Sequence, residues 1–138
     1  MIIHNASILT AIGETGLVLY KFGKTTSIPF DNENVKAPID VINQNLKNSL
    51  HTLVLLDLDS SNNRYMNAKD ALSYLIKNGI SENKKVLVCS ELGGNSDIVY
   101  GNINKLAKLK FDKFPQSLIV PSEKLHFIEE EALELWKI

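Results

Sequence analysis

With 138 residues, of which 44% are hydrophobic, the chain is long enough to bury the core of one compact domain. Its 15 basic residues are balanced by 16 acidic ones, so it lacks the positive charge that would bind nucleic acid by counterion release. The single cysteine, Cys89, excludes an internal disulfide, and no secretory leader or apolar run of about 20 residues is visible. We therefore expect a soluble protein of the reducing cytoplasm with no membrane partner.

The first part of the chain predicts two helices and one extended segment. Residues 5–12 have apolar side chains at helical spacing, and Asn5 can cap this first helix. Residues 25–30 (TTSIPF) predict a short extended piece, and the polar residues 31–36 predict a surface loop. A second helix begins near Pro38, which suits a first helical turn, and its apolar stripe consists of Ile39, Ile42, Leu46 and Leu50.

The rest of the chain predicts buried strands that alternate with amphipathic helices. The aliphatic run HTLVLLDLD at residues 51–59 is typical of a strand that is buried on both faces. Asn67 can cap a helix over residues 68–79, whose predicted buried face consists of Ala71, Leu72, Leu75 and Ile76. Further strands are predicted at residues 84–92, 97–101 and 116–122, and further helices at residues 104–109 and 127–136.

This order of elements indicates an α/β domain in which helices flank a parallel or mixed sheet. In such sheets, ligands bind where loops leave the carboxyl ends of strands. We therefore expect the candidate site residues at three strand exits, which are Leu56–Asp57, Leu92–Gly94 and Pro121–Ser122.

The polar and glycine residues at these exits have two interpretations. Asp57 and Asp59 follow an apolar strand and could ligate a metal or act as acid and base. Aspartates at such positions more often end a strand and start a turn. Gly93 and Gly94 lack the spacing of a phosphate-binding loop. A turn that lets a ligand approach the backbone is the favoured interpretation of this pair.

The histidines and the cysteine do not form a recognisable catalytic or metal motif. His4, His51 and His126 lie in different elements without HxH or HExxH spacing, which argues against zinc. Each is better explained as a partly buried, hydrogen-bonded residue, although His126 lies near a strand exit and could face a site. Cys89 lies in an aliphatic strand, where burial raises the pKa of a thiol and keeps it inert.

A resemblance to a known family rests on four stretches, namely IHNASILTAIGETGLVLYKFGKTT, NLKNSLHTLVLLDLD with RYMNAKDAL, VLVCSELGGN with IVYGNINKL, and FPQSLIVPSEKLHFIEEEAL. In this order they span nearly the whole chain and resemble the diphthine synthases. The resemblance implies that residues 31–138 form the carboxy-terminal α/β domain of the tetrapyrrole methylase-like (class III) methyltransferase fold. Residues 1–30 would be a remnant of the amino-terminal domain with its connection, and we expect the family's amino-terminal cofactor domain to be absent.

Members of this family bind S-adenosylmethionine between two α/β domains. The resemblance implies that Ser7 and Ile8 contact this cofactor from the side of the amino-terminal domain, and that Leu56 and Leu92 contact it from strand ends. Backbone groups at strand exits can satisfy the adenine edge, and aliphatic side chains can flank its ring. Core packing is the alternative explanation for the two leucines. Gln116 would also contact the cofactor, at a position where relatives commonly have histidine.

The implied activity is methylation of elongation factor 2. The substrate would be the amino group of its 3-amino-3-carboxypropyl-histidine, in diphthamide biosynthesis. The catalytic residues are unknown, and no metal is expected. The expected partners are elongation factor 2, a separately encoded amino-terminal half, and a second copy of the chain in a homodimer.

Two departures from the family keep a second class of function open. Gln116 cannot titrate as histidine does, and Glu91 stands where relatives usually have arginine, which reverses a charge. With the expected absence of the amino-terminal domain, these changes favour a non-catalytic binding or assembly module as the alternative. A methyltransferase of the same fold that acts on a small tetrapyrrole is a third hypothesis, and fold alone cannot separate the two substrate classes.

Overall fold

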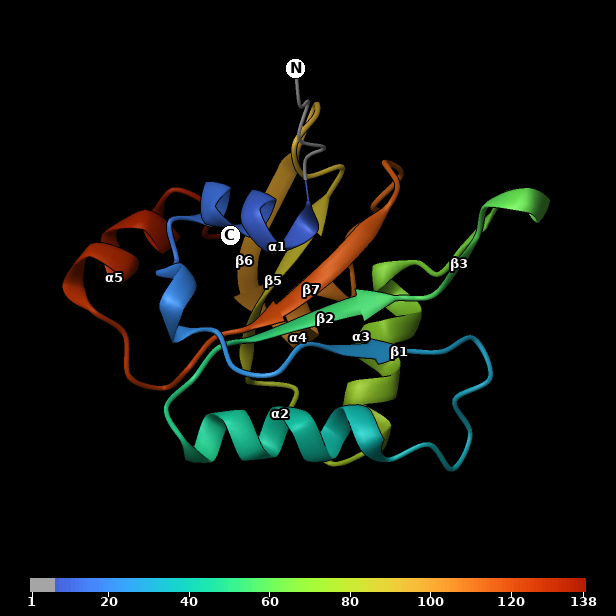
Figure 1. Cartoon of the computed structure of the whole chain (residues 1–138), viewed down its shortest axis with the longest axis horizontal. Helices are drawn as coiled ribbons and strands as arrows, with labels where there is room; N and C mark the ends of the chain where they lie inside the picture. The colour runs from blue at the N-terminus through green and yellow to red at the C-terminus, as the bar shows by residue number, and fades with distance from the viewer. Residues whose placement is uncertain (1–6) are drawn as a thin grey trace, which may run out of the picture.

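The computed structural model describes residues 7–138 and contains a five-stranded mixed sheet. The strand order is β1-β2-β7-β5-β6 (Figure 1). In chain order the elements are α1 (Ile8–Ala11), η1 (Ile12–Thr15), η2 (Leu19–Lys21), β1 (Thr26–Ile28), α2 (Ala37–Lys47), β2 (Thr52–Leu56), β3 (Leu58–Asp59), η3 (Ser60–Asn62), β4 (Arg64–Tyr65), α3 (Ala68–Lys77), β5 (Lys85–Ser90), β6 (Asp97–Asn102), α4 (Ile103–Leu106), β7 (Gln116–Val120) and α5 (Phe127–Glu134). The predicted class, a mixed sheet flanked by helices, is confirmed.

Strand direction decides which loops meet at each edge of the sheet. β1 is parallel to β2, whereas β7 is antiparallel to both β2 and β5. Leu55 of β2 pairs with Ser117, and Ser90 of β5 pairs with Gln116. The carboxyl ends of β2 and β5 therefore meet the amino end of β7 at one edge, which we call the exit edge. The carboxyl end of β7 lies at the opposite edge.

Helices cover both faces of the sheet and divide the core in two (Figure 1). On one face, apolar side chains of α2, α3 and α4 pack against alternate residues of the central strands, among them Val54, Val88 and Leu118. On the other face, Ile12, Leu17 and Leu133 pack against the intervening residues, which include Leu53, Leu87, Cys89 and Ile119. The alternation follows from the two-residue period of a strand that is buried on both sides.

Several details of the fold differ from the prediction. The first helix is the short α1, and Ser7 caps it by accepting a hydrogen bond from the Leu9 amide at 3.2 Å, whereas the predicted cap Asn5 lies outside the described residues. On α3, Ile76 is 40% exposed and does not belong to the buried face. Tyr74 is buried instead, and its hydroxyl donates to the Val35 carbonyl oxygen. The hairpin β3–β4, which projects from the sheet, was not predicted.

Among the described residues, no helix is long and apolar enough to cross a bilayer.

Candidate functional site

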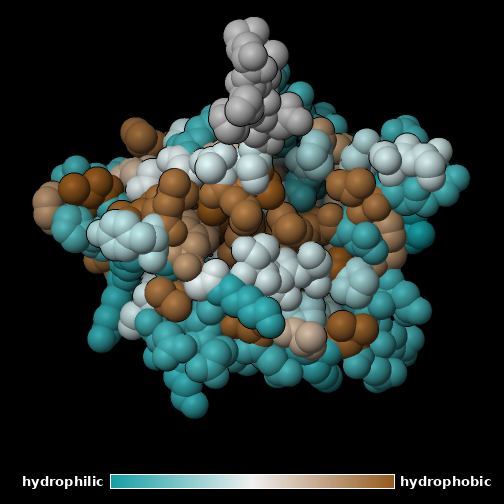
Figure 2. Space-filling view, in the orientation of Figure 1, coloured by the Kyte–Doolittle hydropathy of each residue, from teal (hydrophilic) through white to brown (hydrophobic). Residues whose placement is uncertain are grey.

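A cavity of about 460 Å³ opens at the exit edge, on the face of the sheet that α1 partly covers. Its walls come from α1, β1, β2, β7 and the loop after β5, and it is lined by Ser7, Ile8, Ala11, Ser27, Leu55, Leu56, Asp57, Leu58, Leu92, Pro115, Gln116 and Ser117. Figure 2 shows hydrophobic side chains gathered across the middle of this face. A concave, mostly apolar site with a few polar groups is the usual form of a small-molecule pocket.

The five residues predicted to contact a cofactor all line this cavity: Ser7, Ile8, Leu56, Leu92 and Gln116. They come from four separate parts of the chain, and the strand pairings explain how they meet. Leu56 ends β2, Leu92 follows the end of β5, and Gln116 begins β7, so three of them lie at one edge of the sheet. α1 brings Ser7 and Ile8 above that edge. Their contact with a cofactor remains a prediction.

The third predicted strand exit does not belong to this cavity. Pro121 and Ser122 follow β7, and because β7 is antiparallel to its neighbours they lie at the opposite edge of the sheet. There the Ser122 backbone amide donates to Nδ1 of His51 at 2.9 Å. The exit prediction was wrong for this segment, because the rule applies to parallel strands and β7 runs the other way.

The Gln116 side chain is largely engaged within the protein. Its Oε1 accepts a hydrogen bond from the Ala68 amide at 2.7 Å, and this satisfies a donor at the start of α3. Its Nε2 donates to the carbonyl oxygens of Phe111 and Lys113, both at 2.9 Å. Both amide protons are thus used, and only a remaining lone pair on Oε1 is available for a ligand. Sequence reasoning missed these internal contacts, because the partners lie far from Gln116 along the chain or on a loop.

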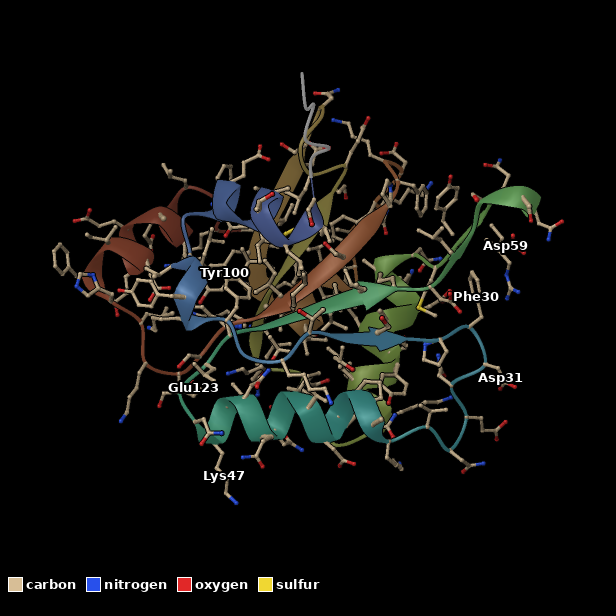
Figure 3. The ribbon with its side chains drawn as sticks, viewed as in Figure 1. Phe30, Asp31, Lys47, Asp59, Tyr100 and Glu123 are labelled. Carbon is tan, nitrogen blue, oxygen red and sulfur yellow. The ribbon has the colours of Figure 1, made fainter. Side chains whose placement is uncertain are left out.

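Asp57 and Asp59 have different surroundings although they are two residues apart. The Asp57 carboxylate accepts hydrogen bonds from the backbone amides of Phe30, at 3.1 Å, and Leu58, at 3.0 Å, and the residue lines the cavity. Asp59 lies on the projecting hairpin (Figure 3) and accepts from the side chains of Ser61 and Asn62, each at 2.6 Å. These hydrogen bonds lower the pKa of Asp59, and the turn interpretation holds for this residue.

No group of three or more histidine, cysteine or acidic residues that could hold a metal ion occurs in the described part of the chain. Cys89 is buried in β5, and desolvation raises the pKa of its thiol to about 12. The prediction that Cys89 is a core residue is confirmed.

The loop after β5 forms a tight turn beside the cavity. Glu91 and Gly93 have the left-handed φ values of 52° and 85°, and the Gly94 amide donates to the Glu91 carbonyl oxygen at 3.0 Å. The Glu14 carboxylate of η1 holds this turn, since it accepts from the Gly93 amide at 3.4 Å and from the Ser96 hydroxyl. The favoured interpretation of the glycine pair as a turn is thus confirmed, and the turn places Leu92 against the cavity.

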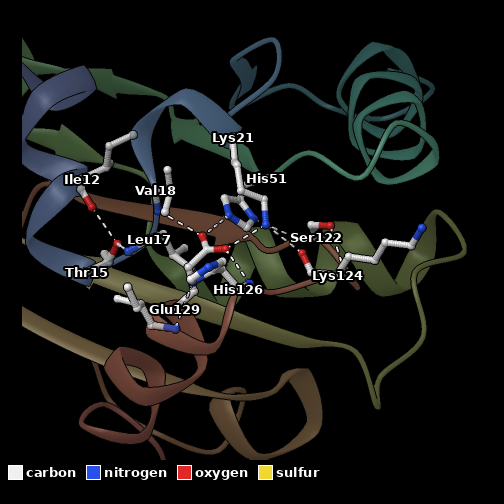
Figure 4. A network of polar contacts seen from close by, with 11 residues as sticks. Ile12, Thr15, Leu17, Val18, Lys21, His51, Ser122, Lys124, His126 and Glu129 are labelled. Carbon is white, nitrogen blue, oxygen red and sulfur yellow. Dashed lines mark hydrogen bonds and ion pairs between the residues drawn. The ribbon is translucent and has the colours of Figure 1, made fainter.

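A buried polar network connects the amino-terminal segment to α5 at the opposite edge of the sheet (Figure 4). The Glu129 side chain is 0% exposed. It accepts hydrogen bonds from the Val18 and His126 amides, both at 3.0 Å, from Lys21 Nζ at 2.8 Å, and from His51 Nε2 at 2.6 Å. In the sequence, Glu129 is the first of three consecutive glutamates near the start of a predicted helix, and this pattern gives no sign that its side chain is buried.

The network fixes the protonation of its members. Because the Ser122 amide donates to Nδ1 of His51, the proton lies on Nε2 and is donated to Glu129, which makes the imidazole neutral. Desolvation lowers the pKa of His51, although Glu129 acts in the opposite direction. Burial alone would raise the pKa of Glu129, but the hydrogen bonds from Lys21, Val18, His126 and His51 lower it to about 2.

The histidines were predicted to be partly buried and hydrogen-bonded. His51 is hydrogen-bonded and buried completely, whereas His126 is hydrogen-bonded but exposed. His126 caps α5 through a capping box with Glu129 and lines none of the cavity, so it does not face the candidate site. His4 lies outside the described residues.

No family model matches the chain. It is 44% identical over 144 residues to the diphthine synthase of Methanococcus maripaludis strain S2 and 43% identical over 146 residues to that of Methanocaldococcus jannaschii. Each match covers 97% of this chain and 56% of the relative, so the chain spans about half the length of the curated relatives it matches.

Solved structures agree with these sequence matches. A candidate diphthine synthase from Entamoeba histolytica superposes with a TM-score of 0.90 at 32% identity, over 99% of this chain and 59% of the other. A second diphthine synthase structure gives a TM-score of 0.87 at 30% identity, over 98% and 53%. Nearly the whole of this chain is therefore homologous to the diphthine synthases, and it fits the carboxy-terminal portion of their fold.

Proposed function

We propose that this chain supplies the carboxy-terminal part of the active site of an S-adenosylmethionine-dependent methyltransferase of the diphthine synthase type. The single observation that best supports the proposal is the cavity at the exit edge. It brings together Ser7, Ile8, Leu56, Leu92 and Gln116, the five residues that the family resemblance predicts to contact the cofactor. The names of the relatives point to the same chemistry.

The cavity walls suit a nucleoside cofactor. Leu56, Leu92 and Ile8 offer aliphatic surfaces for the two faces of an aromatic base, and backbone groups at the strand exits can pair with its edge. S-adenosylmethionine supplies a methyl group that is attached to a cationic sulfur. The contribution of this chain would be to bind the cofactor and to exclude water from one side of it.

The proposed substrate is the amino group of the 3-amino-3-carboxypropyl-histidine of elongation factor 2. Transfer requires an amine without its proton, aligned with the methyl group and shielded from water. One wall of a cleft can provide only part of that alignment. We therefore expect activity to need the remaining portion of the enzyme, supplied as a separate polypeptide or in the same chain.

Isothermal titration calorimetry with S-adenosylmethionine tests this proposal. The chain is titrated alone and after mixing with an equal amount of the amino-terminal portion of the Methanococcus maripaludis relative. Binding that is weak or absent for the chain alone and at least about tenfold tighter for the mixture, a gain of about 1.4 kcal/mol, is the expected result. The mixture is then assayed for methylation of elongation factor 2 that carries the modified histidine.

A matched pair of variants localises the binding. Leu92→Arg places a long cationic side chain in the cavity wall and should abolish binding, because it takes up space in the cavity and repels the cationic sulfur of the cofactor. Leu109→Arg is the control, since Leu109 is a partly exposed leucine that does not line this cavity. Binding that survives Leu92→Arg would place the cofactor elsewhere.

A non-catalytic binding or assembly module is the second candidate. One observation favours it: both amide protons of Gln116 are used within the protein, so this residue offers a ligand less than a free side chain would. A correctly folded mixture that captures elongation factor 2 but never S-adenosylmethionine would support the module and contradict the enzyme.

A further inference from the structure

Among the described residues, one ionisable side chain lines the cavity at the exit edge. Its other lining residues are serine, alanine, proline, glutamine, leucine and isoleucine, all of which are neutral at every pH of interest. The exception is Asp57, which directly follows Leu56 at the end of β2. The lining of the cavity, as far as the described residues form it, therefore has a charge of −1 when Asp57 is ionised.

Two backbone donors hold the Asp57 carboxylate in place. The Phe30 amide donates to Oδ2 at 3.1 Å and the Leu58 amide donates to Oδ1 at 3.0 Å. No lysine, arginine or histidine forms an ion pair with Asp57 in the described part of the chain. Each oxygen keeps a second lone pair, so the negative charge is positioned by the protein without being neutralised by it.

A single uncompensated carboxylate in an apolar cavity favours a cationic ligand. Moving a cation from water into an apolar site is costly, and an opposite charge within a few ångströms offsets that cost. A neutral ligand of the same shape gains nothing from the carboxylate. The strength of this preference depends on low local polarity, which the leucines and isoleucine of the lining provide.

We propose that Asp57 is a specificity-determining residue that makes the cavity prefer the cationic methylsulfonium form of the cofactor over its neutral, demethylated thioether. This inference rests on the proposed function. S-adenosylmethionine and S-adenosylhomocysteine share the adenosine, the ammonium and the carboxylate, and they differ in the methyl group and in the charge on sulfur. The preference assigned to Asp57 concerns that charge alone, and it would favour release of the spent cofactor.

A purely structural role for Asp57 makes a different prediction. The carboxylate also connects the end of β2 to the residue after β1, through the Phe30 amide. If that connection were its only task, removing the charge would weaken both ligands equally or leave both unchanged. The ratio of the two affinities therefore separates the two roles.

The experiment measures both affinities by calorimetry for three forms of the full chain, each mixed with the amino-terminal portion of the Methanococcus maripaludis relative. Asp57→Asn removes the charge and keeps an oxygen that can accept a hydrogen bond. Asp31→Asn is the matched control, because Asp31 is an exposed aspartate on the loop after β1 (Figure 3) and lines none of the cavity.

We expect the wild type and Asp31→Asn to bind S-adenosylmethionine at least about tenfold more tightly than S-adenosylhomocysteine, a difference of about 1.4 kcal/mol. Asp57→Asn should bind S-adenosylhomocysteine as the wild type does and lose most of the tenfold preference. Unchanged affinity for S-adenosylhomocysteine also shows that the variant cavity is intact. If Asp57→Asn keeps the preference, or weakens both ligands equally, the inference is wrong while the proposed function stands.

A second measurement on the wild type alone does not depend on the folding of a variant. Raising the salt concentration from about 0.05 to 0.5 M screens charge pairs that water can reach. The affinity for S-adenosylmethionine should fall by a larger factor than that for S-adenosylhomocysteine, because only the first ligand carries the charge on sulfur. Equal salt dependence of the two would overturn the inference. A mixture that binds neither ligand would overturn the proposed function and this inference together.

Discussion

The two edges of the sheet each hold an acidic side chain, and the molecule uses them in opposite ways. At the exit edge, Asp57 accepts two backbone hydrogen bonds beside an open cavity. At the other edge, Glu129 is 0% exposed and accepts four hydrogen bonds, from two backbone amides, Lys21 and His51. A buried carboxylate whose two oxygens each accept two hydrogen bonds stabilises the fold, whereas one with free lone pairs beside a cavity is available to a ligand.

The buried network also explains how the amino-terminal segment reaches the cavity. Glu129 connects Val18 and Lys21 to α5, and Trp136 Nε1 donates to the Thr15 carbonyl oxygen at 2.9 Å. Gly16 permits the close approach, since a Cβ at this position would lie 2.3 Å from Cβ of Ala132. These contacts anchor η1 and η2 to α5, and α1 precedes them directly, above the exit edge. The contacts at the edge opposite the cavity thus position one wall of the candidate site.

The largest effect on stability is expected from Glu129→Gln, which removes the buried carboxylate at the edge opposite the cavity. The amide cannot accept from four donors, and it faces the Lys21 ammonium without a compensating charge. Removing one partner of a buried ion pair costs about 3–5 kcal/mol, and chemical denaturation at pH 7 should show a loss of that size. Glu130→Gln is the control, because Glu130 is the exposed next residue. An equal, small effect of both variants would show that the network contributes little.

A smaller loss is expected from Gln116→Ala at the exit edge. This change leaves the Ala68 amide and the carbonyl oxygens of Phe111 and Lys113 without their partner. Buried polar groups that lose a partner cost about 1–3 kcal/mol, and urea denaturation should report about 2–3 kcal/mol. Gln44→Ala, on the exposed side of α2, should change stability by less than about 0.5 kcal/mol. If Gln116→Ala leaves the stability unchanged, these hydrogen bonds contribute little to the fold, and the Gln116 amide would be available to a ligand.

The pKa shifts of His51 and Glu129 predict how the stability of the protein depends on pH. The pKa of His51 in the fold is lowered from the value of 6.5, so the unfolded chain binds the proton first as the pH falls. Stability from this residue is complete above about pH 6.5 and is lost below it, by at most about 1.4 kcal/mol per pH unit. The pKa of Glu129 is lowered from 4.5 to about 2, so its contribution is lost between about pH 4.5 and pH 2.

Denaturation at pH 7.0, 6.0 and 5.0 checks the histidine part of this prediction. The wild type should lose stability over this range, and a His51→Gln variant, although less stable overall, should lose less of it. Parallel pH profiles of the two proteins would mean that His51 does not cause the acid sensitivity.

The smallest effect is expected from Glu14→Gln, which loosens the turn after β5. Glu14 is exposed, and its acceptor contacts with Gly93 and Ser96 lie at the surface. Global stability should fall by less than about 1 kcal/mol. Amide hydrogen exchange at Gly93 should become several times faster, while exchange in β5 stays unchanged. Unchanged exchange at Gly93 would show that the turn keeps its shape without Glu14.

Much of the fold could be predicted because short stretches of the sequence are enough to indicate its main strands and helices. Aliphatic runs marked β2, β5 and β7, and the cap at Asn67 with its apolar stripe marked α3. Strand direction could not be predicted, since the residues of β7 are equally apolar whichever way the strand runs. This is why Pro121 and Ser122 were expected at the wrong edge. The burial of Glu129 was hidden too, because its four donors come from segments far apart in the chain.

The strand pattern predicted site residues at the exits that include Leu56 and Leu92, whereas Ser7, Ile8 and Gln116 came from the family resemblance alone. Leu56 and Leu92 look like ordinary core leucines in the sequence, and only the sheet register shows that they flank one cavity. Asp57 had two interpretations, and its position in the lining supports a role beyond ending the strand.

The most direct test of the contrast between the two edges is a titration of the isotope-labelled chain with S-adenosylmethionine, followed by amide chemical shifts in NMR spectra. The amino-terminal portion of the Methanococcus maripaludis relative is present unlabelled. We predict large shift changes at Ser27, Asp57, Leu92 and Ser117, which line the cavity, and small ones at His51 and Ser122. Changes centred on His51 and Ser122, with the cavity residues unmoved, would contradict the assignment of ligand binding to the exit edge.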